Sequence, residues 1–273
     1  MALEKTRKWR WGVNRWWILG FTILGIVAVN LFAPVQPHIQ VAAEKLIEEP
    51  ILHLGPLGDL YLTNTLTATV LLDIIILVIA FSVHEFSHAW TADLFGDLTP
   101  RYQGRLTLNP IVHIDPMGAL LLVVAGFGWA RPVEIDPYAL QRRSPAAPMI
   151  VALAGPVSNL LLAIAAAIPF RMGLLAVSFP SGTLPSIEML ATQFIYINLV
   201  LFFFNLLPIA PLDGDKIVAY FIPRSFASTW EQIRRFGPMI LLLVVFLGPS
   251  LGFDLLGTIL GPPLGNLFWL LVG

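Results

Sequence analysis

The feature that most constrains this chain is a series of apolar stretches long enough to cross a lipid bilayer. About 20 consecutive apolar residues span the hydrocarbon core as an α-helix, and unsatisfied backbone groups exclude open irregular structure there. We expect four clear spans and a final pair interrupted by prolines, at residues 16–33, 66–91, 149–170, 189–209, 238–253 and 255–272. The sequence therefore predicts an all-α membrane protein with about six transmembrane helices.

Composition agrees with this fold class and excludes several kinds of chemistry. Hydrophobic residues make up 57% of the chain and charged residues only 12%, which is unusual for a soluble domain. The absence of cysteine rules out disulfides, thiolate metal sites and cysteine nucleophiles. The net charge of −1, without a long basic run, argues against a nucleic-acid partner.

The positive charges predict how the chain crosses the membrane. Of the 16 lysines and arginines, all except Lys45 and Arg171 fall on one side of the expected spans. Short cytoplasmic loops carry such an excess, so we expect a multi-pass protein of the cell membrane with a cytoplasmic N-terminus. The longest loop, residues 92–148, leaves no room for a soluble domain, and residues 1–273 are expected to form a single membrane domain.

The loop between the second and third spans has a pattern of its own. Residues 105–109 and 131–135 alternate like short strands, whereas residues 117–129 are apolar but too short to span. Non-helical backbone at membrane depth is tolerated only where it is buried in protein or lines a wet cavity. We therefore expect a short β-hairpin or re-entrant loop here, lying against a polar site.

The second span contains the sequence His84-Glu85-Phe86-Ser87-His88 near its cytoplasmic end. Residues four apart share a helix face, so both imidazoles can reach one zinc ion, and Glu85 can take a proton from bound water. The alternative is a buried hydrogen-bond network. We favour the metal site because ionisable groups in a membrane helix are costly and are typically functional.

A catalytic zinc site needs a third protein ligand, and Asp213 is the candidate. It follows Pro208 and Pro211, which end the fourth span. The second and fourth spans run in the same direction, so their C-terminal ends are expected at similar depth on the cytoplasmic side. The alternative is an aspartate that only stabilises a turn or helix end.

These segments resemble the site-2 protease family of intramembrane zinc metalloproteases, in a compact form without a PDZ or CBS domain. The resemblance rests on His84-Glu-x-x-His88 together with Asn205-x-x-Pro-x-x-Pro-x-Asp213-Gly214, and three further segments match, at residues 109–118, 128–133 and 154–159. The chain departs from the family where Gly214-Asp215-Lys216 stands in place of a frequent Gly-Gly-Arg.

The resemblance implies a zinc metalloendopeptidase that cleaves transmembrane segments of other membrane proteins. One zinc ion per chain would be held by His84, His88 and Asp213, with Glu85 as the general base for the attacking water. Further residues are candidates for binding the substrate or the developing oxyanion, namely Asn159, Asn205 and His113. The alternative for each asparagine is an interhelical hydrogen bond. For His113 the alternative is a loop histidine bonded to backbone, and for this residue we favour the alternative.

The expected partners are transmembrane protein substrates and the lipid bilayer. We expect prior trimming by another protease, or a regulatory membrane protein, to control substrate entry, and the sequence does not determine the oligomeric state. Two other functions remain open, a metal-binding membrane transporter and an inactive membrane scaffold. A transit site must release its ion, and a scaffold has no need of Glu85, so both are less consistent with the motifs.

Overall fold

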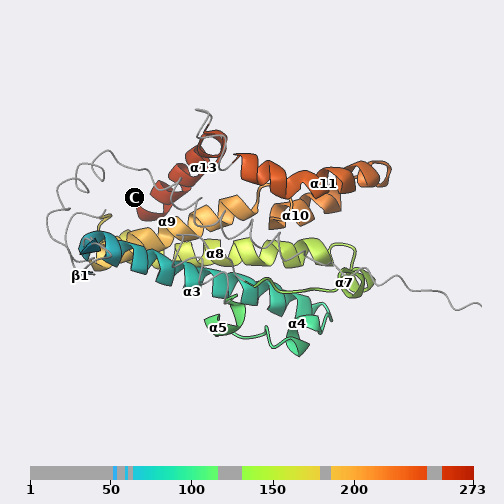
Figure 1. Ribbon diagram of the computed structural model, residues 1–273, viewed down its shortest axis with the longest axis horizontal. Coiled ribbons are helices and arrows are strands. Elements are labelled where there is room, and N and C mark those ends of the chain that lie inside the picture. The colour runs from blue at the N-terminus through green and yellow to red at the C-terminus, as the bar shows by residue number, and fades with distance from the viewer. Residues whose placement is uncertain (1–51, 54–58, 61–63, 116–130, 179–185, 245–253) are drawn as a thin grey trace, which may run out of the picture.

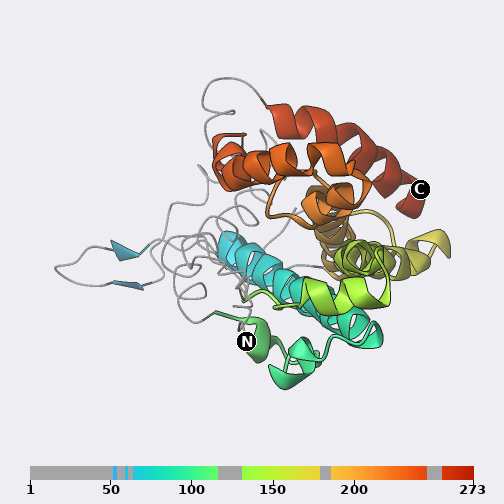
Figure 2. The ribbon, with the colours of Figure 1, turned by 90° about the vertical axis from the view of Figure 1, so that its right-hand side faces the viewer.

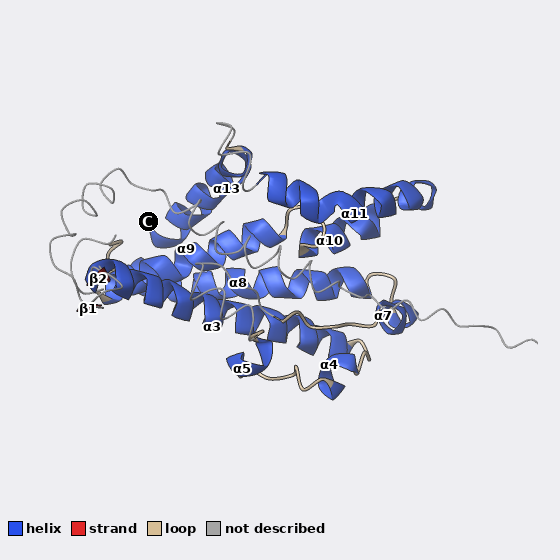
Figure 3. Ribbon diagram, viewed as in Figure 1, coloured by secondary structure: helices blue, strands red, loops and turns tan. Residues whose placement is uncertain are grey.

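The computed structural model describes residues 52–53, 59–60, 64–115, 131–178, 186–244 and 254–273, and these are mostly helical (Figure 3). The long helices are α3 (Asn64–Leu94), α8 (Ala147–Arg171), α9 (Ile187–Asn205), α11 (Ala227–Leu242) and α13 (Leu255–Val272). The shorter ones are α4 (Thr99–Tyr102), α5 (Pro110–His113), α7 (Pro137–Arg143), α10 (Asp213–Phe221) and the 3₁₀ helix η2 (Arg224–Phe226). Two antiparallel two-residue strands, β1 (Leu52–His53) and β2 (Asp59–Leu60), pair Leu52 with Leu60.

Four helices of the described part are long and apolar enough to cross a membrane. They are Leu72–Leu94, Ala147–Arg171, Ile187–Asn205 and Leu255–Val272. They correspond to the second, third, fourth and last predicted spans. The predicted first span, residues 16–33, lies outside the described residues, as does the end of the span predicted at 238–253. The total of six spans therefore stays a prediction.

The predicted hairpin between the second and third spans is not confirmed. Residues 105–109 and 131–135 form no strand, and residues 117–129 lie outside the described part of the chain. A side chain joins the two segments instead, because the buried Arg105 guanidinium donates to the carbonyls of Val112 and Arg131. The side chain of Arg105 therefore faces inward, and its guanidinium bridges the backbone of these two parts of the loop.

Three helices, α3, α8 and α9, pack side by side and form the centre of the molecule (Figures 1 and 2). Small residues allow this close approach, since Ala80 of α3 and Ala163 of α8 are fully buried. The helices α3 and α9 run in one direction and α8 in the other (Figure 1). The C-terminal ends of α3 and α9 therefore lie at the same end of the bundle, as the topology predicted.

The C-terminal helices α11 and α13 lie on the side of this bundle opposite to α4 and α5 (Figures 1 and 2). An ion pair between the half-buried Arg234 and the buried Asp215 joins α11 to α10, because Arg234 Nε donates to Asp215 Oδ2 at 2.8 Å. Burial raises the pKa of the Asp215 carboxyl, and the Arg234 charge opposes that rise. Arg234 therefore stabilises a carboxylate that is only 1% exposed.

We expect Arg234→Met to destabilise the protein by about 3–5 kcal/mol, because the buried Asp215 charge would lose its partner. Thermal unfolding of the purified protein in detergent measures the effect. Arg235→Met, which removes an exposed positive charge from the same helix, is the control and should leave the midpoint unchanged. The double variant Asp215→Ala/Arg234→Met should recover most of the loss. An unaltered midpoint in Arg234→Met would contradict the stabilising role of this pair.

Candidate metal centre

The two histidines of the motif lie one turn apart on α3, near its C-terminal end. Their side chains project from the same helix face, as residues four apart do, and the two Nε2 atoms are 3.0 Å apart. Both histidines are buried, with 4% and 8% of their surface exposed. A polar pair of this kind inside an apolar helix needs a specific partner.

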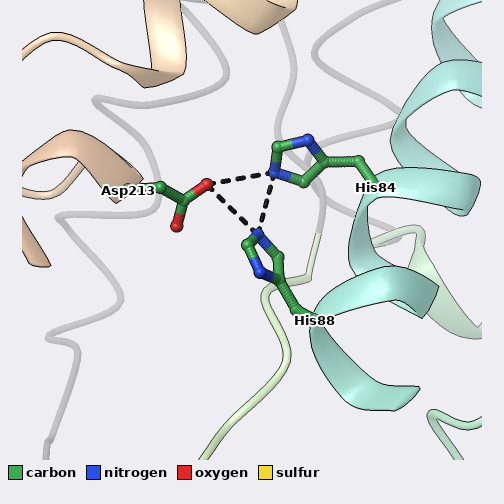
Figure 4. Close-up of side chains that lie close together, drawn as sticks. All are labelled: His84, His88 and Asp213. Atoms are coloured by element: carbon green, nitrogen blue, oxygen red, sulfur yellow. Dashed lines mark hydrogen bonds and ion pairs between the residues drawn. The ribbon is translucent and has the colours of Figure 1, made fainter. Parts of the chain in front are cut away.

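Asp213 supplies that partner from a distant part of the sequence (Figure 4). Helix α9 ends at Asn205, and a turn containing Pro208 and Pro211 leads to α10, whose first residue is Asp213. Asp213 Oδ2 lies 3.2 Å from His84 Nε2 and 3.1 Å from His88 Nε2. The predicted meeting of the two helix ends is therefore present in the structure.

A second set of contacts fixes the orientation of both imidazoles. His84 Nδ1 lies 2.6 Å from Asn159 Oδ1, and His88 Nδ1 lies 2.6 Å from the Val151 carbonyl oxygen. Both oxygens are hydrogen-bond acceptors, so these contacts favour the tautomer that carries its proton on Nδ1 in each ring. The Nε2 lone pairs then face the shared point beside Asp213, which is the arrangement that metal-binding histidines adopt.

Gly155 of α8 provides the space in which the imidazoles meet. A Cβ atom built on this glycine would lie 2.3 Å from His88 Nε2 and 2.5 Å from His84 Nε2, which is closer than real contacts allow. Only glycine fits here. Sequence analysis noted the segment 154–159 without assigning this role, although Gly155 precedes Asn159 by four residues and therefore shares its helix face.

The residues present suit a zinc ion. One donor atom from each of His84, His88 and Asp213 lies within 4.8 Å of the others, and all three residues are buried. Two imidazoles and a carboxylate are ligands that zinc binds, and a catalytic site uses three protein ligands with a further position for water or substrate. The group could therefore hold zinc, as the sequence predicted.

Glu85 lies on the same helix turn as the histidines but outside this group of three. Its side chain is half-buried, and Oε2 accepts a hydrogen bond from the backbone N–H of Val133 at 3.0 Å. The extended segment around Val133 therefore lies beside the glutamate. This part of the loop between the second and third spans lies against a polar residue of the site, while the apolar part at residues 117–129 lies outside the described residues.

The predicted substrate-binding residues lie in different surroundings. Asn159 is fully buried, and its Nδ2 also donates to Asn198 Oδ1 at 3.0 Å. It contacts the His84 ring at Nδ1, not at the Nε2 atom that faces Asp213. Asn205 Nδ2 donates within its own helix to the Leu201 carbonyl oxygen at 3.0 Å. His113, 2% exposed, contacts the Thr107 carbonyl oxygen through Nε2 at 2.9 Å. That contact is the backbone bond that we favoured for this histidine.

Asn198 of α9 is a buried contributor that sequence analysis missed. Its Nδ2 donates to the Phe194 carbonyl oxygen at 2.9 Å, while its Oδ1 accepts from Asn159. The chain of contacts therefore runs from α9 through Asn159 to the His84 ring. The sequence signal for this role of Asn198 was its position as an asparagine inside an apolar span, because such residues commonly form hydrogen bonds between membrane helices.

These features define a helical membrane protein with a buried centre of two histidines and one aspartate. The chain belongs to peptidase family M50, the site-2 protease family, whose model matches residues 172–247. That match includes Asp213, and the similarity to whole relatives extends over more of the chain.

The family of this chain is shown by its similarity to relatives from two bacterial genera. The chain is 42% identical to YwhC of Bacillus subtilis over 180 residues, which cover 64% of this chain and 80% of that protein. It is 30% identical to Rip2 of Mycobacterium tuberculosis over 67% of this chain and 69% of that protein. Both relatives are named as zinc metalloproteases, and His84, His88 and Asp213 of this chain form a group that could hold a metal ion. No solved structure matches the chain.

Proposed function

We propose that this protein is an intramembrane zinc metalloprotease that hydrolyses peptide bonds in transmembrane segments of other membrane proteins. The observation that carries the proposal is the meeting of His84, His88 and Asp213 at the end of a helix able to cross a membrane. A hydrolytic centre at this position acts on peptide bonds that lie in or near the bilayer. Family membership supports the reaction type.

The contacts at the site support a division of chemical roles. Zinc, when bound, polarises the substrate carbonyl and allows water to lose a proton near neutral pH. Glu85 accepts this proton and later passes it to the leaving nitrogen. Its Oε2 atom is held by the Val133 N–H, so we assign the proton transfer to Oε1. The burial of His84 and Asp213 strengthens electrostatic interactions with the reacting groups.

The asparagines have separate proposed roles. Asn159 orients His84 through Nδ1 and thereby presents Nε2 to the metal. Asn205, at the C-terminal end of α9, is the remaining candidate for contacting the substrate carbonyl or oxyanion. For His113 the contact with Thr107 supports a role in shaping the loop, through which it could affect substrate binding.

We further propose the topology and partners expected from the sequence. Residues 1–273 form one domain with six spans, and the N-terminus and the metal centre face the cytoplasmic side of the cell membrane. The distribution of lysine and arginine supports this orientation. Transmembrane proteins are the substrates, and prior trimming or a partner membrane protein regulates their entry.

Removing the metal tests the proposed reaction class. The purified protein is expected to retain one zinc ion per chain through dialysis and to cleave a model transmembrane substrate in liposomes. Treatment with a strong zinc chelator should reduce cleavage to background, and added zinc should restore it, because the proposed chemistry needs the metal. Zinc content by atomic absorption and cleavage by gel measure both properties.

The same liposomes distinguish the alternatives. A transporter would move zinc across the vesicle membrane at a rate that exceeds protein-free vesicles, whereas we expect no such flux. Cleavage that persists in the fully zinc-free protein would refute the proposed function. Asp213→Asn is a useful companion variant, because it should lose zinc and cleavage together if Oδ2 of the carboxylate is a ligand.

A further inference from the structure

Lys216 lies one helix turn after Asp213 and contacts it directly. Its Nζ donates to Asp213 Oδ1 at 3.0 Å, and the pair has the i, i+3 spacing that brings side chains together on a helix. The carboxylate is buried, whereas 41% of the lysine side chain is exposed. In the sequence, Lys216 stands out only because Gly214-Asp215-Lys216 departs from the frequent Gly-Gly-Arg of the family.

The two oxygens of Asp213 have different partners. Oδ2 faces the Nε2 atoms of His84 and His88, at 3.2 and 3.1 Å. Oδ1 faces away from them and accepts from Lys216. A carboxylate can rotate about its terminal bond and can bind a metal through one oxygen or both. The lysine contact selects one orientation and leaves a single oxygen directed at the imidazoles.

The backbone that carries both residues is held tightly. A Cβ atom on Gly214 would lie 2.3 Å from the Leu207 carbonyl oxygen and 2.4 Å from that of Leu206. The first turn of α10 is therefore pressed against the end of the preceding turn. With the backbone fixed, the remaining freedom of Asp213 is the rotation of its side chain, which is the freedom that Lys216 limits.

The neighbouring charges explain why Lys216 contacts Asp213. The other acidic residue of this turn, Asp215, is bonded to Arg234 of α11 at 2.8 Å, so its charge has its own partner. The positive charge of Lys216 therefore lies beside the carboxylate of Asp213.

We propose that Lys216 is a positioning residue that fixes Asp213 as a one-oxygen metal ligand. The inference rests on the proposed function, because it assumes that Asp213 binds zinc. Groups that hold a metal ligand in place through hydrogen bonds typically change metal affinity or activity by about 10–100-fold when they are removed. Lys216→Met keeps a side chain of similar length and removes both the charge and the donor.

The test measures Zn²⁺ affinity of the full-length protein in detergent by competition with a chromogenic chelator. Lys216→Met is expected to bind zinc about 10–100-fold more weakly, and Lys216→Arg, which keeps a charged N–H donor, should recover most of the affinity. Arg235→Met, which removes an exposed positive charge outside the site, should bind as the unmodified protein does. Visible absorption of the Co²⁺-loaded proteins provides a second readout, because it reports coordination geometry.

Several results would overturn the inference. Zinc affinity of Lys216→Met within twofold of the unmodified protein would do so, even if cleavage were slower, because that result indicates a substrate contact. Equal losses in Lys216→Met and Lys216→Arg would also do so, because charge and donor would then be irrelevant. Failure of the proposed function is distinguishable, because the unmodified protein would then cleave no model substrate in liposomes, whereas the Zn²⁺ affinities of these variants are measured without substrate.

Discussion

Glu85→Gln is expected to lower cleavage of a model transmembrane substrate by about 10²–10⁴-fold, the usual contribution of a general acid–base group. Glutamine has almost the same shape as glutamate but cannot take a proton from water near neutral pH. Its amide oxygen can still accept the Val133 N–H that contacts Glu85 Oε2, so the local structure should be kept. Zinc content should therefore remain at one ion per chain, since Glu85 lies outside the three-residue group.

The experiment needs a carboxylate control from the same region. Glu134 is exposed and accepts from Gln103 Nε2 at 2.9 Å, so Glu134→Gln removes a nearby negative charge without touching the proposed base. We expect this control to cleave at close to the unmodified rate. Equal activity of Glu85→Gln and the unmodified protein would reject Glu85 as the proton acceptor, whatever the zinc content.

Gly155→Ala is the second change with a large expected effect, and it should remove the metal rather than the proton transfer. The added methyl carbon would overlap the positions of His84 Nε2 and His88 Nε2, at 2.5 and 2.3 Å. Both rings would have to turn away from Asp213 or α8 would have to move. We expect zinc content to fall to near zero and cleavage to fall to background with it.

A second helical glycine gives the matched control. Gly261 lies in the apolar helix α13, and a Cβ atom there would meet nothing within 4 Å. Gly261→Ala should therefore keep zinc and activity. If Gly155→Ala also bound zinc normally, the histidine rings could not lie where the structure places them. The two large predictions are independent, because one variant retains the metal and the other loses it.

Several parts of the site could be predicted because they depend on local spacing. The four-residue interval between His84 and His88 predicts a shared helix face wherever the helix lies. Asp213 could be predicted from topology, because α3 and α9 run in the same direction and a proline-containing turn follows α9. The structure brings these three residues together.

Other parts could not be predicted because they depend on which atoms meet after packing. The alternating residues 105–109 indicated a strand, but the side chain of Arg105 faces inward. Its guanidinium donates hydrogen bonds to the backbone carbonyls of Val112 and Arg131. For Asn159 the sequence left open a substrate contact or an interhelical hydrogen bond, and only the packed structure shows which side chains it contacts, His84 and Asn198. The importance of Gly155 is visible only when the distance to both imidazoles is known.

The sequence by itself determined that this chain is a helical membrane protein with a metal-binding motif, since apolar length and helical periodicity are local properties. Only the tertiary structure decided how the ligands are held. Gly155 makes room for the rings, Asn159 and the Val151 carbonyl orient them, and Lys216 takes the second oxygen of Asp213. These contacts join residues from α3, α8 and α10, and their distances follow from helix packing, which no local pattern in the sequence encodes.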